Sequence, residues 1–230
     1  MPQLFEKALA LLKRRLHNHN KAFTDYVAAV EFTQIKPDFL GPPNDTYMSK
    51  KEREKQIAEI TAAIEKEPDN PEHLLQRGCA YTCFGETKGH SPDAFDNAIA
   101  DFTAAHKMKP DNPHYLRFRA LTYYYQKEYD KAIADFAAAL KIKEGEKEYL
   151  AERGRVYHCK GDYDNAIADY NAAAVQDEDL IWRGIAYACK KEYDKAIADL
   201  EEASQQHHYE EMAKALLQKV REKIVPLYTR

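Results

Sequence analysis

Apolar and small residues recur in one fixed order along the chain, and the same eight-residue phrase appears four times. Each copy begins with an aromatic residue, contains Ala-Ile-Ala-Asp, and ends with Phe, Tyr or Leu. Its apolar residues have the spacing of an amphipathic helix. The first alanines of the copies are separated by 132 − 98 = 34, 166 − 132 = 34 and 196 − 166 = 30 residues. A phrase with a period in the thirties predicts stacked helical repeats, so we expect an all-α fold. The four alanines are Ala98, Ala132, Ala166 and Ala196.

A second stripe precedes each phrase and predicts a first helix in every repeat. In the first copy it consists of Leu74, Gly78 and Tyr81. Its small central residue faces the alanine of the phrase, so the two helices can approach to the near end of the 8–10 Å range. The later copies are Leu116, Ala120 and Tyr123, then Leu150, Gly154 and Tyr157, and then Leu180, Gly184 and Tyr187.

Together the two stripes resemble the tetratricopeptide-repeat family. Gly78, Tyr81, Ala98, Phe102 and Pro110 stand at the family's glycine, tyrosine, alanine, phenylalanine and proline positions. Leucine replaces the family's large aromatic residue and arginine replaces its leucine, which leaves the fold prediction unchanged. The resemblance implies a right-handed α-solenoid of helix–turn–helix repeats that binds other proteins.

The repeats divide the chain into three parts. We expect a helical region with a proline-rich connector at 1–48, a solenoid at 49–204, and a C-terminal capping helix at 205–230. The first part loosely echoes the repeat. Within the solenoid, a helix at 49–67 comes before four clear repeats at 71–110, 113–146, 147–176 and 177–204.

Two irregular spacings predict local departures from the repeat. A second match, between residues 59–71 and 101–113, has an offset of 42, so eight residues are inserted relative to the period of 34. Glycines and Pro92 in the inserted stretch predict an extended loop from Gly85 to Asp93. The later spacing of 30 marks a deletion of four residues, and we expect the helix after Ala173 to be one turn short.

Arginine precedes the small residue of every first helix, and aspartate closes every phrase. One interpretation is a ladder of arginines that binds an acidic ligand. The other is a repeated Arg–Asp pair, in which the guanidinium group matches the carboxylate bidentately. Because both partners occur in every repeat, the sequence favours the pair. The residues are Arg77, Arg119, Arg153 and Arg183, with Asp101, Asp135, Asp169 and Asp199.

The side of the first helices beside the buried stripe is the candidate binding surface. In tetratricopeptide proteins the first helices line a concave groove that receives a peptide, so the resemblance implies a partner segment there. Aromatic and arginine side chains anchor interfaces, which predicts an apolar or aromatic segment with an acidic group as ligand. The alternative is packing between repeats, favoured for Leu121 and Ile185. The candidate residues are Arg117, Leu121, Tyr124, Tyr125, Arg155, His158, Trp182 and Ile185.

Composition narrows the function classes. The formal net charge of −4 provides no general attraction for nucleic acid or anionic membrane. Four cysteines without close paired spacing indicate a reducing compartment, so we expect a cytoplasmic protein. The motifs of nucleotide sites, hydrolases and zinc proteases are missing from the sequence, which predicts no enzyme, cofactor or metal. A protein-binding scaffold or adaptor is the main hypothesis. A secretion-type or assembly chaperone, an enzyme's regulatory subunit and, less favoured, an RNA-binding helical repeat are the alternatives.

Overall fold

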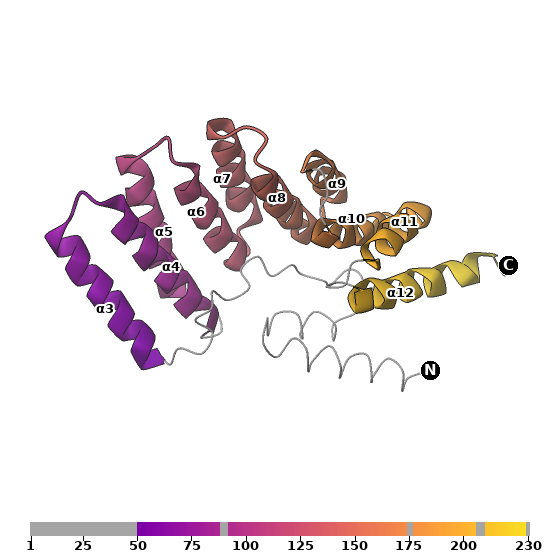
Figure 1. Ribbon diagram of the computed structural model, residues 1–230, viewed down its shortest axis with the longest axis horizontal. Helices are drawn as coiled ribbons and strands as arrows, with labels where there is room; N and C mark the ends of the chain where they lie inside the picture. The colour runs from indigo at the N-terminus through magenta and orange to yellow at the C-terminus, as the bar shows by residue number, and fades with distance from the viewer. Residues whose placement is uncertain (1–49, 88–91, 174–176, 206–209, 229–230) are drawn as a thin grey trace. The chain divides into compact units, whose positions relative to one another are not determined.

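The computed structural model describes residues 50–87, 92–173, 177–205 and 210–228. These residues form α-helices joined by short turns, without a β-strand in the described ranges (Figure 1). The predicted all-α solenoid of helix–turn–helix repeats is confirmed. The helical region expected at 1–48 lies outside the described residues.

The described helices belong to two compact units. In the N-terminal unit, which ends at Tyr149 in helix α8, each helix packs against its neighbour in the chain: α3 on α4, α4 on α5, α5 on α6 and α6 on α7. Its helices are α3 (Lys50–Lys66), α4 (Pro71–Thr87), α5 (Pro92–Met108), α6 (Pro113–Tyr125) and α7 (Tyr129–Ile142).

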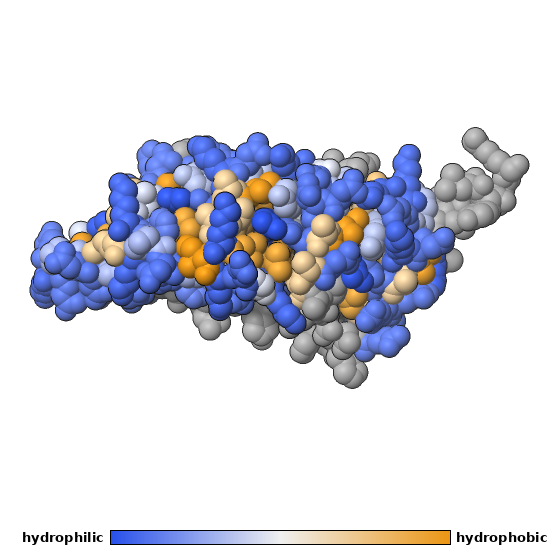
Figure 2. Space-filling model, turned by 90° about the horizontal axis from the view of Figure 1, so that it is seen from above, coloured by the Kyte–Doolittle hydropathy of each residue, from blue (hydrophilic) through white to orange (hydrophobic). Residues whose placement is uncertain are grey.

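Within the described residues the C-terminal unit begins at Leu150, in α8, and its helices also pack against their neighbours in the chain. Helix α10 packs against both α9 and α11, and α11 packs against α12. Its helices are the remainder of α8 (Lys147–Lys160), α9 (Tyr163–Ala172), α10 (Asp177–Cys189), α11 (Tyr193–Ala203) and α12 (Glu210–Tyr228). Hydrophilic residues cover most of the surface seen in Figure 2, with hydrophobic residues gathered in smaller groups between them.

The starts of α4 and α6 follow from one short sequence, Asp-Asn-Pro. The side-chain oxygen of Asn112 accepts a hydrogen bond from the backbone N–H of His114 at 3.1 Å, and Pro113 is the first helical residue. Asn70 accepts in the same way from the N–H of Glu72, at 3.1 Å. Asparagine satisfies a free N–H at a helix start, and proline has none to lose there, so the sequence fixes both boundaries.

Three of the turns inside helix pairs have one geometry. Lys127, Gly161 and Lys191 adopt positive φ angles of 62°, 87° and 64°. The next residue then donates its N–H to the carbonyl five residues back, at 2.9 Å in each case. This left-handed end of a first helix is easiest for glycine, and two of the three turns nevertheless use lysine. These three first helices therefore end in the same way.

The loop predicted from Gly85 to Asp93 is wrong at both ends. Helix α4 continues through Gly85 to Thr87, and α5 begins at Pro92. A glycine inside a helix costs only about 1 kcal/mol relative to alanine, and proline is favourable at the first helical position. Neither residue therefore forces a loop here. Residues 88–91, in the middle of the predicted loop, lie outside the described residues.

The four-residue deletion shortens a different helix from the one predicted. Helix α10, which follows Ala173, has 13 residues, as many as α6. Helix α9 has 10 residues where α7 has 14, a difference of 14 − 10 = 4, so α9 is the short helix. Helix α10 needs its full length to place Leu180, Gly184 and Tyr187 along its partner. The end of α9 can be removed without this loss.

The predicted contact stripes form the core. The first alanine of each of the four phrases is fully buried, and so are the residues four positions on: Phe102, Phe136, Tyr170 and Leu200. The glycines of the first helices lie directly against three of these side chains. A β-carbon on Gly78 would lie 2.5 Å from a carbon of the Phe102 ring, whereas one on Gly184 would lie 3.1 Å from Leu200 Cγ.

This difference predicts unequal effects of one substitution. Gly78→Ala forces the buried Phe102 ring to move, and overpacking of this kind costs about 1–3 kcal/mol. Gly184→Ala needs a shift of only a few tenths of an ångström, which the better helix propensity of alanine, about 1 kcal/mol, offsets. Urea denaturation should show a lower midpoint for Gly78→Ala and little change for Gly184→Ala. Equal midpoints for the two variants would contradict the close contact at Gly78.

Candidate functional site

The Arg–Asp pairs exist in all four helix pairs, as predicted. In each, Nε and Nη2 of the arginine donate to the two carboxylate oxygens at 2.7–2.8 Å. The aspartates are buried, and the arginine side chains retain 18–21% of their exposure. The hydrogen bonds to aspartate raise the pKa of each arginine, so these groups stay charged. The guanidinium groups are thus engaged within the fold, which supports the structural interpretation over a ligand ladder.

Three of these arginines also reach the preceding second helix, a contact that was not predicted from the sequence. Nη1 of Arg77 donates to Thr61 on α3 at 3.3 Å, and Nη1 of Arg119 donates to Thr103 on α5 at 2.9 Å. Nη1 of Arg183 donates to the side-chain oxygen of Asn171 on α9 at 2.8 Å. Each arginine therefore joins three helices. The sequence feature that could have indicated this contact is a Thr or Asn two residues after the acidic position of the phrase.

The N-terminal unit contains four of the predicted binding residues. Leu121, Tyr124 and Tyr125 are buried, and Tyr124 is 7% exposed. The Tyr124 ring lies 5.5 Å from that of Tyr125 and 6.1 Å from that of Tyr129, centre to centre. These three side chains pack within the fold, as the alternative interpretation held for Leu121.

Arg117, the fourth, is half-buried and lies nearer the surface. Its Nη2 donates to Glu148 at 2.6 Å, and the Glu148 side chain is 57% exposed. The guanidinium carbon also lies 5.5 Å from the ring centre of Phe118 and 5.8 Å from that of Tyr149. A cation near two aromatic rings, with an exposed carboxylate beside it, can exchange that carboxylate for another.

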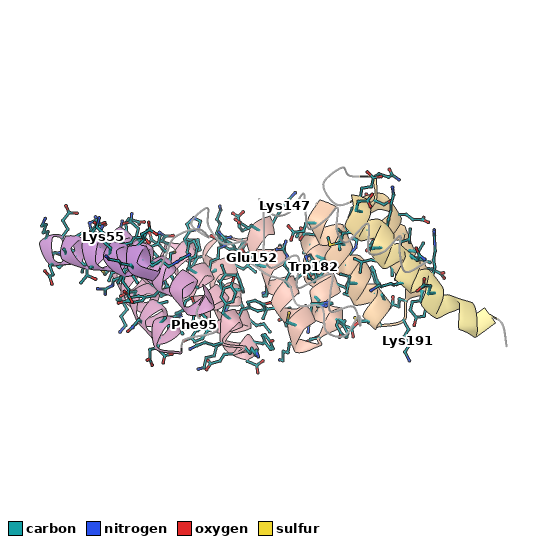
Figure 3. The ribbon with its side chains drawn as sticks, turned by 90° about the horizontal axis from the view of Figure 1, so that it is seen from below. Lys55, Phe95, Lys147, Glu152, Trp182 and Lys191 are labelled. Atoms are coloured by element: carbon teal, nitrogen blue, oxygen red, sulfur yellow. The ribbon has the colours of Figure 1, made fainter. Side chains whose placement is uncertain are left out.

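The C-terminal unit contains the other four. His158, Trp182 and Ile185 are buried, and Arg155 keeps 13% of its side chain exposed. The His158 ring lies edge-on to Trp182, with centres 5.7 Å apart, and Trp182 Nε1 donates to Glu178 at 3.4 Å (Figure 3 labels Trp182). This cluster also packs within the fold.

Arg155 is paired with two carboxylates of α10. Its Nη2 lies 3.2 Å from Asp179 and 3.3 Å from Glu178. Burial opposes the charge of Arg155, but the two carboxylates outweigh it, so the pKa of Arg155 is raised. Asp179 is itself buried, so Arg155 is less open to an incoming ligand than Arg117.

Successive first helices of the N-terminal unit are joined by tyrosine hydroxyl groups. Tyr115 Oη donates to Glu72 at 2.8 Å, and Tyr149 Oη lies 3.0 Å from Nδ1 of His114. Burial, with the hydrogen bond to Glu72, raises the pKa of Tyr115 to about 12. These bridges were not predicted from the sequence, although both tyrosines stand four residues before the arginine of their repeat.

Around these bridges, one side of α4 and α6 stays open to solvent. Each residue on it stands one or two positions from a residue of the contact stripe, which turns its side chain about 100° or 200° away from that stripe residue. We call this set the N-terminal first-helix face. It comprises the exposed Glu72, Gln76 and His114 and the half-buried Leu75, Cys79 and Arg117.

Two other kinds of site are missing from the described ranges. There, His, Cys, Asp and Glu side chains do not gather in groups of three or more that could hold a metal ion. Nor does any helix in those ranges combine the length and apolar character needed to cross a membrane.

Comparison with known proteins gives family matches to two stretches. Models of the tetratricopeptide repeat match residues 94–147 and 148–175. No curated protein matches the chain significantly.

Solved structures with the same fold have low sequence identity to the chain. A crystal structure of MamA is 19% identical with a TM-score of 0.59, covering 73% of this chain and 92% of that one. A tetratricopeptide repeat protein from Parabacteroides merdae is 20% identical with a TM-score of 0.58, covering 77% and 74%. A thermophilic protein of this type from Thermus thermophilus is 15% identical with a TM-score of 0.55, covering 74% and 91%. At these identities the likeness extends to the fold alone.

Proposed function

The chain belongs to the tetratricopeptide-repeat family, and we propose that it is a non-enzymatic scaffold that binds a segment of a partner protein on its first helices. The N-terminal first-helix face is the surface that we assign to this role. The observation that carries the proposal is the pair of Arg117 and Glu148, because it places a half-buried cation beside an exposed and replaceable carboxylate.

The chemistry of this face selects the partner segment. Exposed ion pairs contribute only about 0–1 kcal/mol, so a carboxylate of the partner can displace Glu148 from Arg117 at little cost. Half-buried Leu75 offers an apolar contact on the neighbouring helix α4, which packs beside α6. A segment that combines an apolar or aromatic residue with Asp or Glu satisfies both contacts. This is the ligand chemistry expected from the sequence, placed on fewer residues.

A peptide-display selection against the full-length chain tests the proposal. We expect the enriched peptides to combine apolar or aromatic residues with at least one acidic residue. Arg117→Glu should weaken their binding at least tenfold, because the variant removes the cation and places like charges together, which costs several kcal/mol. Titration of a labelled peptide by fluorescence anisotropy measures this loss.

Lys107→Glu provides the matched control. Lys107 is exposed in the last turn of α5, a second helix, and its substitution makes the same change of charge away from the first-helix face. Peptide affinity should stay within about twofold of the wild type, as expected for a distant exposed charge. Enrichment of basic, polar peptides, or equal losses in both variants, would place the binding surface elsewhere.

A further inference from the structure

A histidine occupies a packing position at the junction between the two helix pairs of the N-terminal unit. His106 lies on α5, three residues after Thr103, whose hydroxyl accepts the hydrogen bond from Arg119 of α6. Residues three apart share one side of a helix, so His106 stands beside the guanidinium group of Arg119. The neighbouring Ala105 is fully buried in the same junction, against Leu74 and Tyr115.

The same position is apolar in the two neighbouring repeats. By the alignment of the phrase, Ile64 precedes His106 by one repeat and Leu140 follows it by one. Ile64 packs against the buried cluster of Leu74, Ala105 and Tyr115. Nδ1 of His106 is buried and makes no hydrogen bond within the described residues. A buried ring nitrogen without a partner is tolerated in the neutral ring and becomes costly when the ring is charged.

The charged groups around His106 determine the effect of a proton. Arg119 of α6 repels a positive charge on the ring, whereas Asp135 of α7 attracts it but already receives both Nε and Nη2 of Arg119. On α4, Arg77 is engaged by Asp101 of α5, and Leu74 presents apolar surface, as does Ala105 on α5 itself. A proton on His106 therefore adds a second cation to a site whose carboxylate is already bound.

We propose that His106 makes the junction between the α4–α5 pair and the α6–α7 pair sensitive to mild acid, so that protonation of its ring weakens the stacking of the two pairs. Burial, together with Arg119, lowers the pKa of His106 below its ordinary value, while Asp135 raises it less. The unfolded chain then binds the proton more readily than the folded chain. The contribution to stability is fully present above about pH 6.5, the unperturbed value, and is lost as the pH falls below it.

Urea denaturation of the full-length chain at pH 7.5 and pH 5.0 tests this junction. From pH 7.5 to pH 5.0, the urea midpoint of the wild type should drop by more than the midpoint of His106→Leu. This variant carries the apolar residue found at Leu140. His106→Lys keeps a positive charge at both values, so its midpoint at pH 7.5 should already be lowered. The control is Lys107→Gln, because Lys107 is exposed on the same helix and lysine stays charged at both pH values, so this variant should keep the wild-type dependence on pH.

A second measurement makes the result specific to one residue. The ring-proton signal of His106 in an NMR titration, assigned by its loss in His106→Leu, should shift with a midpoint below that of exposed histidines. An equal fall of the urea midpoint in wild type and His106→Leu, or a His106 titration at or above the midpoint of exposed histidines, would overturn the proposal. The experiment contains no partner, so its failure would leave the proposed scaffold function standing.

Discussion

Replacing Asp135 with alanine is expected to lower the free energy of unfolding by about 3–5 kcal/mol, because it leaves the charge of Arg119 without its carboxylate in a largely buried place. Both Asp135 oxygens accept from Arg119, and the Arg119 side chain is only 18% exposed. The same guanidinium group is tied to Thr103 on the preceding pair. The variant should therefore weaken the stacking between the α4–α5 and α6–α7 pairs as well as the packing within the α6–α7 pair. Urea denaturation followed by circular dichroism measures it.

Two controls separate the stranded charge from other effects. Asp111→Ala removes an exposed aspartate just before α6 and should change stability by no more than about 0.5 kcal/mol. The double variant Arg119→Met with Asp135→Leu removes both charges, and buried ion pairs replaced by apolar residues are often neutral or more stable. It should therefore lose less than Asp135→Ala. A double variant that is less stable than Asp135→Ala would show that the pair itself, and not the stranded charge, carries the effect.

The helix pairs and the Arg–Asp contacts were predictable from the sequence because they repeat. The same contact occurs in every repeat, so two positions that are always occupied by partners, such as those of Arg119 and Asp135, differ visibly from positions that vary between repeats. The helix starts at Asn70 and Asn112 can be inferred from the local sequence, because a capping residue binds the backbone of the first turn that follows it.

Changes of repeat length were harder to place. Spacing counts the residues inserted or deleted between two fixed positions, but it does not say where they fall. The inserted residues lengthened α4 through Gly85, and the deleted ones shortened α9 instead of α10. Whether a helix continues depends more on its tertiary packing than on single glycines, and the sequence alone does not show that packing.

The candidate binding residues show a further limit. Helical spacing correctly separates the contact stripe from the rest of each first helix, but it does not reveal which of the remaining positions a neighbour covers. Arg117 and Tyr124 lie on one helix outside the stripe, yet Arg117 is half-buried beside an exposed carboxylate and Tyr124 packs against two tyrosines. Side-chain size and the adjacent helix decide the outcome, and neither is periodic.

Tyr124→Ala is accordingly expected to act on stability before it acts on binding. The Tyr124 ring is buried against Tyr125 and Tyr129, and truncating a buried aromatic residue to alanine costs about 3–5 kcal/mol. Tyr124→Phe keeps the ring and should stay within about 1.5 kcal/mol of the wild type, as volume-conserving changes do. Thermal and urea denaturation of the two variants measure the difference.

The same variant distinguishes a packing residue from a ligand contact. At a temperature where Tyr124→Ala remains folded by circular dichroism, the peptides selected on the wild-type chain should bind it within about threefold, less than 1 kcal/mol. Arg117→Glu should lose binding at least tenfold under the same conditions, because its charge lies at the proposed surface and not in the core. If Tyr124→Ala instead keeps wild-type stability and loses the peptides, then Tyr124 is a ligand anchor, as the sequence alone predicts. The Tyr124 ring, which is buried in the free chain, would then become exposed to the partner when the partner binds.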